Sequence, residues 1–171
     1  KNKIIFHEKG KLFDVLSLIK NGTFCVDNQT CSVFNENLIR SKFKIIKKED
    51  PIYNLKSIKN NIEINNMIKA HIEDGVALTK FIYWIKNIKS FNIDELIVEK
   101  KLEKLRKKNK NYLYPSFSTI AGSGPNGAII HYKSNKQTNR KIHKKDLLLV
   151  DSGGQYKWGT TDVTRTITFD K

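Results

Sequence analysis

The spacing of the apolar residues changes along the chain, and this change limits the possible folds more than any other feature. From about residue 62 to residue 87, isoleucines recur every four residues, at Ile64, Ile68 and Ile72. Further apolar residues widen this stripe: Met67, Val76, Leu78, Phe81, Ile82 and Ile85. This pattern predicts one long amphipathic helix. A second helix is predicted to begin after Asp94 as its N-cap, because Glu95 follows and cations end the segment ELIVEKKLEKLRKK.

After about residue 112 the pattern becomes typical of strands. Glycine-rich or charged turns separate four apolar or β-branched runs: FSTIAGSG, GAIIHY, DLLLV and TTDVTRTITF. Two helices followed by such runs predict an α+β unit, in which an antiparallel sheet lies behind the helices.

Residues 1 to about 55 are organised differently. KLFDVLSLIK is typical of a short helix, TFCVD of a buried strand and SKFKIIKKE of another strand. These segments predict the end of an α/β domain. The segment EDPIYNLKSIKN contains Pro51 and is predicted to be a linker. The predicted domains are therefore residues 1–55 and residues 56–171.

The chain carries a net charge of +15 over 171 residues. Its lysines are scattered among asparagines and isoleucines without a ladder of aromatics and arginines, so nucleic acid is not an expected partner. No apolar run approaches the ~18 residues that a membrane-spanning helix needs, and the first residues lack a signal-peptide cleavage site. Cys25 and Cys31 match neither a redox nor a zinc spacing. We expect free thiols and a cytoplasmic protein, with a digestive compartment as the alternative.

Two aspartates stand eleven residues apart, Asp151 after LLLV and Asp162 within TTDVTRT. If the two runs pair as a hairpin, carboxylates on one face lie within a few ångströms of each other. Such carboxylates repel unless a cation neutralises them, and their oxygens suit manganese, magnesium, zinc or cobalt. Two ions held in this way could activate a water molecule for hydrolysis.

The same residues have a purely structural interpretation. Asp151 can begin an Asx turn into SGG, and Asp162 can be an edge-strand residue paired with Arg165. His131 ends the strand-like run GAIIHY and titrates near neutrality. It can bond a substrate carbonyl or a transition-state oxygen, or it can be a structural histidine. Spacing alone leaves these alternatives open.

PSFSTIAGSGPNGAIIHY, DLLLVDSGGQY and GTTDVTRT together resemble the catalytic domain of the aminopeptidase P family, the Xaa-Pro aminopeptidases of the pita-bread superfamily. The resemblance extends over about residues 50–171 and is greatest to the longer, multidomain eukaryotic type. It implies the opening half of a pita-bread catalytic domain. The preceding residues would then be the end of an α/β domain like the N-terminal domain of creatinase.

The resemblance also implies roles for individual residues. Asp151 matches the family's first metal-ligand aspartate, and Asp162 matches the aspartate that bridges two metal ions. His131 matches the histidine beside the scissile bond, which binds substrate or stabilises the transition state. Thr164 is implied as a partner of the metal ligands. The implied cofactor is a pair of divalent ions, Mn²⁺ ahead of Zn²⁺ or Co²⁺.

The family completes its metal site with a histidine and two glutamates from later in its chains, beyond the segments that this sequence contains. We therefore expect these 171 residues to be a fragment that needs the remainder of the catalytic domain and has no activity alone. Trp158 stands where relatives often have an acidic residue before GTTD, a difference that leaves both aspartates unchanged.

The implied activity is removal of the N-terminal residue from peptides with proline in the second position, by a protein that is often a homodimer. Prolidase, which has the same chemistry but is restricted to dipeptides, is the nearest alternative. The other alternative is a non-catalytic pita-bread protein that binds proteins or nucleic acid.

Overall fold

The computed structural model describes residues 4–90 and 92–169. The chain divides into two compact units, Lys1–Lys59 and Asn60–Lys171. The boundary predicted at residue 55 therefore lies four residues before the end of the first unit, inside helix α3 (Pro51–Ser57). Each unit is described by itself below.

The first unit contains two parallel strands and short helices. Its elements are η1 (Lys9–Lys11), α1 (Leu12–Ser17), β1 (Thr23–Val26), α2 (Val33–Arg40), β2 (Lys44–Lys47) and α3. Parallel strands need a crossover connection, and the segment containing α2 supplies it. Leu16, Val26 and Phe43 form the buried centre, where the rings of Phe24 and Phe43 lie 4.7 Å apart between centroids.

One sequence prediction for this unit is wrong: TFCVD is not a buried strand, because Val26 is the only residue of β1 that is buried. The predicted linker contains the boundary between the two units, but it also contains an unpredicted helix. This helix is α3, at whose start the Asp50 side chain accepts a hydrogen bond from the backbone N–H of Ile52. Pro51 occupies the first helical position, where a missing N–H leaves no hydrogen bond unmade. This proline therefore begins a helix instead of preventing one.

The second unit begins with the two predicted helices, α4 (Asn61–Lys86) and α5 (Glu95–Arg106). Asn60 and Glu63 form a capping box at the start of α4, each accepting a hydrogen bond from the other's backbone N–H. Asp94 caps α5 by accepting from the backbone N–H of Ile97 at 2.8 Å. Both helices are therefore confirmed.

The predicted stripe of α4 is confirmed at Leu78, Phe81 and Ile85, which are buried. It is wrong at its isoleucines, because Ile64, Ile68 and Ile72 are 45%, 54% and 64% exposed. The buried positions are Ala70, Asp74, Ala77, Leu78, Phe81 and Ile85. Towards its middle the helix thus turns a small and an acidic residue inward, Ala70 and Asp74, in place of the isoleucines.

Six strands and a short helical turn follow α5 in the described part of the chain. They are β3 (Tyr112–Pro115), β4 (Ile120–Ser123), η2 (Gly124–Ala128), β5 (Leu148–Ser152), β6 (Gly154–Tyr156), β7 (Gly159–Thr160) and β8 (Val163–Ile167). Their pairings give two antiparallel three-stranded sheets, in the orders β3-β6-β7 and β4-β5-β8. The predicted antiparallel sheet is confirmed.

The two sheets share one long hairpin. Leu148 pairs with Ile167 at its open end, and Tyr156 pairs with Gly159 beside the two-residue turn at Lys157 and Trp158. The register does not slip between these pairs, because each step along one arm is matched by one step back along the other. The backbone N–H of Thr161 donates to the Gly154 carbonyl at 2.9 Å, which continues this register between the sheets.

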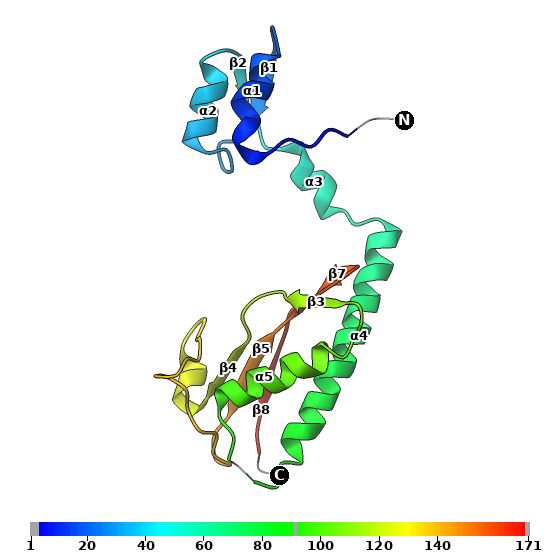
Figure 1. The fold of residues 1–171 in the computed structure, drawn as a ribbon, viewed down its shortest axis with the longest axis vertical. Coiled ribbons are helices and arrows are strands. Elements are labelled where there is room, and N and C mark those ends of the chain that lie inside the picture. Colours follow the sequence, from blue (N-terminus) through cyan, green and yellow to red (C-terminus); the bar gives the residue numbers. More distant parts are fainter. Residues whose placement is uncertain (1–3, 91, 170–171) are drawn as a thin grey trace. The chain divides into compact units, whose positions relative to one another are not determined.

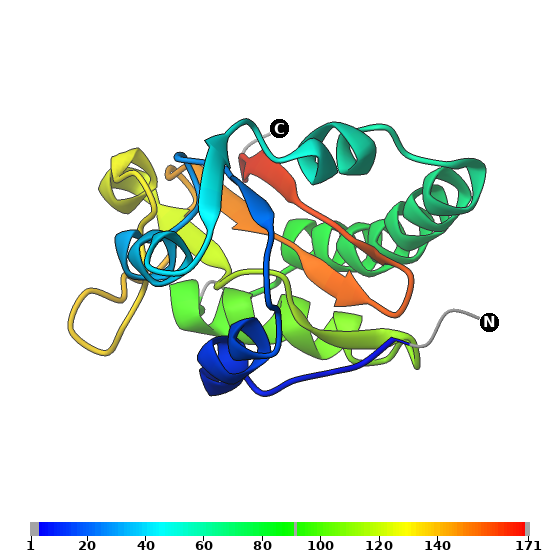
Figure 2. The same ribbon diagram turned by 90° about the horizontal axis from the view of Figure 1, so that it is seen from above.

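The main core lies between the helices and the sheet β4-β5-β8. Helix α5 lies across these strands and α4 runs beside α5 (Figures 1 and 2). The core contains Leu78, Phe81, Ile85, Ile93, Val98, Leu102, Ala121, Ile142, Leu148, Val150 and Ile167. Alternate residues of β5 face this core, so the residues between them face away from the helices.

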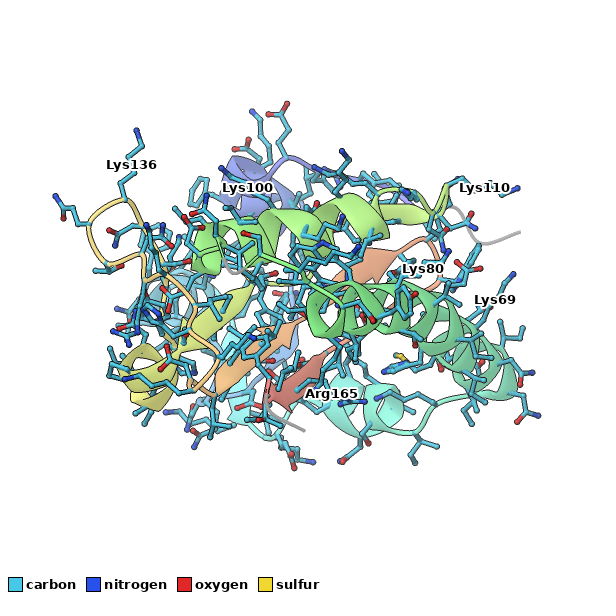
Figure 3. The ribbon with its side chains drawn as sticks, turned by 90° about the horizontal axis from the view of Figure 1, so that it is seen from below. Lys69, Lys80, Lys100, Lys110, Lys136 and Arg165 are labelled. Atoms are coloured by element: carbon cyan, nitrogen blue, oxygen red, sulfur yellow. The ribbon has the colours of Figure 1, made fainter. Side chains whose placement is uncertain are left out.

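Positive charge is spread over the second unit. Figure 3 labels cations that come from separate elements: Lys69 and Lys80 on α4, Lys100 on α5, Lys110 after α5, Lys136 in the loop before β5, and Arg165 on β8. None of the described helices combines the length and the hydrophobicity needed to cross a bilayer.

Replacement of Phe81 by alanine tests the core. Phe81 is fully buried, so Phe81→Ala is expected to lower the free energy of unfolding by about 3–5 kcal/mol through lost burial and a cavity. Tyr83→Ala on the same helix is the control, because Tyr83 is 71% exposed and its loss should change stability by less than about 0.5 kcal/mol. Urea unfolding measures both, and equal effects would contradict this placement of the core.

Candidate metal centre

The long hairpin brings the two predicted metal ligands to one face. Asp151 lies in β5 and pairs with Thr164 of β8. Asp162 directly precedes β8, where the same register sets it opposite Gly153. Residues two positions apart along a strand share a face, so Asp151, Asp162 and Thr164 lie on the face away from α4 and α5. Diagonal neighbours of this kind are about 7–8 Å apart between Cα atoms.

Thr164 contacts Asp151 directly. Its hydroxyl Oγ1 donates to Oδ1 of Asp151 at 2.8 Å. This bond fixes Oδ1 of Asp151 and leaves Oδ2 available to bind a cation. Arg165, the predicted structural partner of Asp162, instead donates from Nη1 to the carbonyl of Thr164 at 2.8 Å.

His131 lies in a loop and not at the end of a strand, so the strand prediction for GAIIHY is wrong. Residues 124–128 form η2, and His131 follows in a turn with φ of 55°. Gly122 and Gly127 approach so closely that a Cβ on Gly122 would lie 2.8 Å from the Cα of Gly127. The two glycines therefore permit a fold-back that β-branched periodicity does not predict.

The carboxylate of Glu95 holds this loop. Glu95 is completely buried at the start of α5, and it accepts hydrogen bonds from the backbone N–H groups of Ser123 and Arg140. The side chains of Asn126 and Tyr132 also donate to it. Because these donors flank the residues 124–131, Glu95 fixes both ends of the segment that carries His131. An acidic residue in a first helical turn is usually a dipole contact, so this role was not predicted.

His131 and Asp151 line the same hollow, whose volume is about 290 Å³. Ile120, Thr164 and the segment 127–130 contribute further to its walls. Ile120, Asp151 and Thr164 form one row across the three strands, because Asp151 pairs with both neighbours. The structure thus brings three of the four predicted site residues into one cavity, with Asp162 diagonally beyond Thr164.

The two carboxylates fit divalent ions in ligand type, because hard cations take oxygen ligands. They do not make a complete site. Among the residues that the structure describes, no three His, Cys, Asp or Glu side chains gather closely enough to hold an ion. Ions of this kind take at least about four ligands, so further groups are required.

A buried ion pair lies behind the aspartates. Nε of Arg106 donates to Oδ1 of Asp74 at 2.6 Å and Nη2 donates to Oδ2 at 3.0 Å. Nη2 also donates to the hydroxyl of Ser152 at 3.1 Å, and the hydroxyl of Tyr156 donates to Asp74 at 2.8 Å. Arg106, one of the cations near the end of α5, is therefore completely buried and not on a solvated face.

One signal for this pair was available in the sequence. Asp74 lies four residues from both Ala70 and Leu78, so it occupies the buried face of an otherwise apolar helix pattern. Burial alone would raise the pKa of Asp74, but the hydrogen bonds and the charge of Arg106, with bonds from Tyr156 and Thr161, hold this pKa below its usual value.

The sequence and the fold can now be compared with known proteins. The pattern of metallopeptidase family M24 matches residues 65–171. The chain is 48% identical over 130 residues to the Xaa-Pro aminopeptidase ApepP of Drosophila melanogaster, an alignment that covers 75% of this chain and 21% of the relative. It is 43% identical over 129 residues to the probable Xaa-Pro aminopeptidase P of Paracoccidioides brasiliensis, with 74% and 21% coverage.

Comparison with solved structures also finds Xaa-Pro peptidases. The X-prolyl aminopeptidase of Caenorhabditis elegans, described as a cytosolic enzyme with a di-nuclear active site, superposes with a TM-score of 0.82 at 26% identity. This match covers 96% of the present chain and 28% of that chain. Prolidase from Pyrococcus furiosus gives a TM-score of 0.73 at 27% identity, covering 95% and 48%.

The chain belongs to metallopeptidase family M24. Its α+β architecture is part of the pita-bread fold of the aminopeptidase P structures. The chain spans about a fifth of the length of the curated relatives that it matches.

Gly153→Ala is expected to distort the hairpin between the aspartates. A Cβ at Gly153 would lie 1.9 Å from the carbonyl oxygen of Thr161 and 2.2 Å from Oγ of Ser116, so the arms must separate. We expect a loss of about 1–3 kcal/mol in the free energy of unfolding. Gly75→Ala in α4 is the control, because its Cβ meets nothing within 4 Å and should stabilise the helix by up to about 1 kcal/mol. A stable Gly153→Ala protein would refute the close approach.

Asp74→Asn tests the buried ion pair through pH. At about pH 7 the substitution leaves Arg106 buried without a counterion and is expected to cost about 3–5 kcal/mol in the free energy of unfolding. The pKa of Asp74 is lowered in the native state, so this advantage of the wild type is complete above the ordinary value of 3.8 and declines as pH falls through the native pKa. Urea unfolding between about pH 7 and pH 2 measures it, and a difference independent of pH would contradict the assignment.

Proposed function

We propose that this chain forms part of a metallo-aminopeptidase that removes the N-terminal residue from peptides with proline in the second position. The observation that carries the proposal is the shared face of Asp151 and Asp162, with His131 in the same hollow as Asp151. The Xaa-Pro names of the relatives support the substrate class. Activity requires the remaining metal ligands, which residues outside this chain would supply.

Each site residue is assigned a role by its position. Asp151 and Asp162 would hold the ions with oxygen ligands. Divalent ions at this place would lower the pKa of a bound water and polarise the peptide carbonyl. Thr164 keeps the Asp151 carboxylate oriented through its hydroxyl. His131 is exposed on its loop and would donate a hydrogen bond to the oxygen that gains charge in the transition state.

Several finer properties belong to the same proposal. Mn²⁺ is the proposed ion, ahead of Zn²⁺ and Co²⁺, because both available ligands are carboxylates. A cytoplasmic location is supported by the description of the Caenorhabditis elegans enzyme as cytosolic. A homodimer is proposed from the family resemblance. Residues 1–55 are proposed to be the C-terminal part of the domain that precedes the catalytic domain.

Hydrolysis of an Xaa-Pro-Xaa tripeptide with added Mn²⁺ tests the function. The 171 residues alone are expected to be inactive, and a protein that also contains the rest of the catalytic domain is expected to be active. In that protein, Asp151→Asn and Asp162→Asn should each lower kcat/KM by more than about 100-fold. The loss of a metal ligand should lower activity more than the loss of a residue that only orients a ligand. His131→Ala should lower kcat by about 10²–10³-fold with metal content unchanged.

Asp14→Asn is the matched control, because Asp14 is an exposed aspartate of the first unit and its loss should leave kcat/KM unchanged. Cleavage of Xaa-Pro dipeptides but not of tripeptides would identify a prolidase instead. If the complete protein takes up no Mn²⁺ and cleaves neither substrate, the peptidase proposal is wrong and a binding role becomes the better account.

A further inference from the structure

The ion pair between Asp74 and Arg106 contacts the neighbours of both predicted ligands in the chain. Ser152 directly follows Asp151 and accepts from Nη2 of Arg106 at 3.1 Å. Thr161 directly precedes Asp162, and its hydroxyl helps to hold the pKa of the Asp74 carboxylate below its usual value. Ser152 and Thr161 are 0% and 1% exposed. One ion pair from two helices is therefore attached to both arms of the hairpin.

Neighbouring side chains of a strand point to opposite faces of the sheet, and this alternation relates the attached residues to the two aspartates. Ser152 and Thr161 point to the helix side, so Asp151 and Asp162 point to the opposite side. The hydroxyl of Thr161 also accepts from the backbone N–H of Gly154 at 2.9 Å, which ties one arm to the other at the same level. Holding Ser152 and Thr161 from behind thus fixes where the two carboxylates emerge in front.

We propose that Asp74 and Arg106 are positioning residues for the metal centre and set the separation of Asp151 and Asp162. This inference rests on the proposed function, because it assigns the pair a role toward the ions. The proposed role is distinct from a contribution to stability, because a buried ion pair can often be replaced by apolar residues without loss of folding. A pair kept only for folding would have no need to bond both arms beside the ligands.

The geometry requires an arginine. The planar guanidinium binds both oxygens of Asp74 and has a further N–H for Ser152, whereas a lysine ammonium is a single point of charge. The hydroxyl of Tyr156 completes the coordination of Asp74, and burial followed by the hydrogen bond to Asp74 raises the pKa of that tyrosine. Tyr156 therefore stays protonated as a donor.

The experiment uses the complete protein that contains these residues, with Mn²⁺ as the probe. Two variants are compared with wild type: Arg106→Lys, and the double replacement Asp74→Leu with Arg106→Met, which leaves no unpaired buried charge. Calorimetry measures Mn²⁺ affinity, and electron paramagnetic resonance measures the coupling between two bound ions. Hydrogen exchange of residues 150–164, without metal, reports whether the hairpin arms have loosened.

We expect both variants to bind Mn²⁺ about 10- to 100-fold more weakly, as when a group that orients a ligand is lost. The coupled signal should weaken, and exchange at Gly154 and Thr161 should accelerate even in the metal-free protein. Val98→Ala is the matched control, because Val98 is a fully buried residue of the same helix that makes no part of this network. It should lower thermal stability while affinity and coupling stay at the wild-type values.

The outcomes separate the two proposals. A folded double variant with wild-type Mn²⁺ affinity and coupling, while wild type cleaves the tripeptide, would overturn this inference and leave the proposed function standing. An equal loss of affinity in Val98→Ala would also overturn it, because general destabilisation would then explain the effect. A wild-type protein that takes up no Mn²⁺ would overturn the proposed function and this inference together.

Discussion

Arg106 donates hydrogen bonds to both carboxylate oxygens of Asp74 in the interior of the second unit, where both side chains are buried. Charges placed there must be paired, because a lone buried charge costs several kcal/mol. The pair joins α4 to α5, and through Ser152 it joins both helices to the strand that carries Asp151. The positions of the helices and of the candidate metal ligands are thus set by one interaction.

A second buried carboxylate has a comparable task elsewhere. Glu95 collects backbone and side-chain donors from both ends of the loop that carries His131. The ligands and the histidine therefore depend on separate supports, one behind the hairpin and one at the start of α5. The front of the site contains exposed or half-exposed side chains, while the groups that fix it are among the most buried in the unit. Such supports keep an active site ordered before any ligand arrives.

Local rules predicted much of this structure, and their failures have a common cause. The caps and the spacing of apolar residues identified α4 and α5, and β-branched runs identified β4, β5 and β8. The loop around His131 and the inward position of Asp74 in α4 were not predicted, because both depend on a buried polar partner far away in sequence. Pro51 misled for a different reason: a proline ends a helix in its interior but begins one at its first position. Local chemistry left two interpretations of the aspartates open and the family resemblance implied their role, whereas the contacts that support them became visible only in three dimensions.

The unbroken register of the hairpin explains why the two aspartates stand eleven residues apart. Each arm alternates between the helix side and the open side, and a two-residue turn joins the arms. Adding or deleting one residue between Asp151 and Asp162 would shift one arm by a single step and turn one carboxylate toward the helices. Changes in length that keep both carboxylates in front must therefore come in pairs, one residue on each arm. The pairing register of the sheet therefore determines how many residues separate the two aspartates in the sequence.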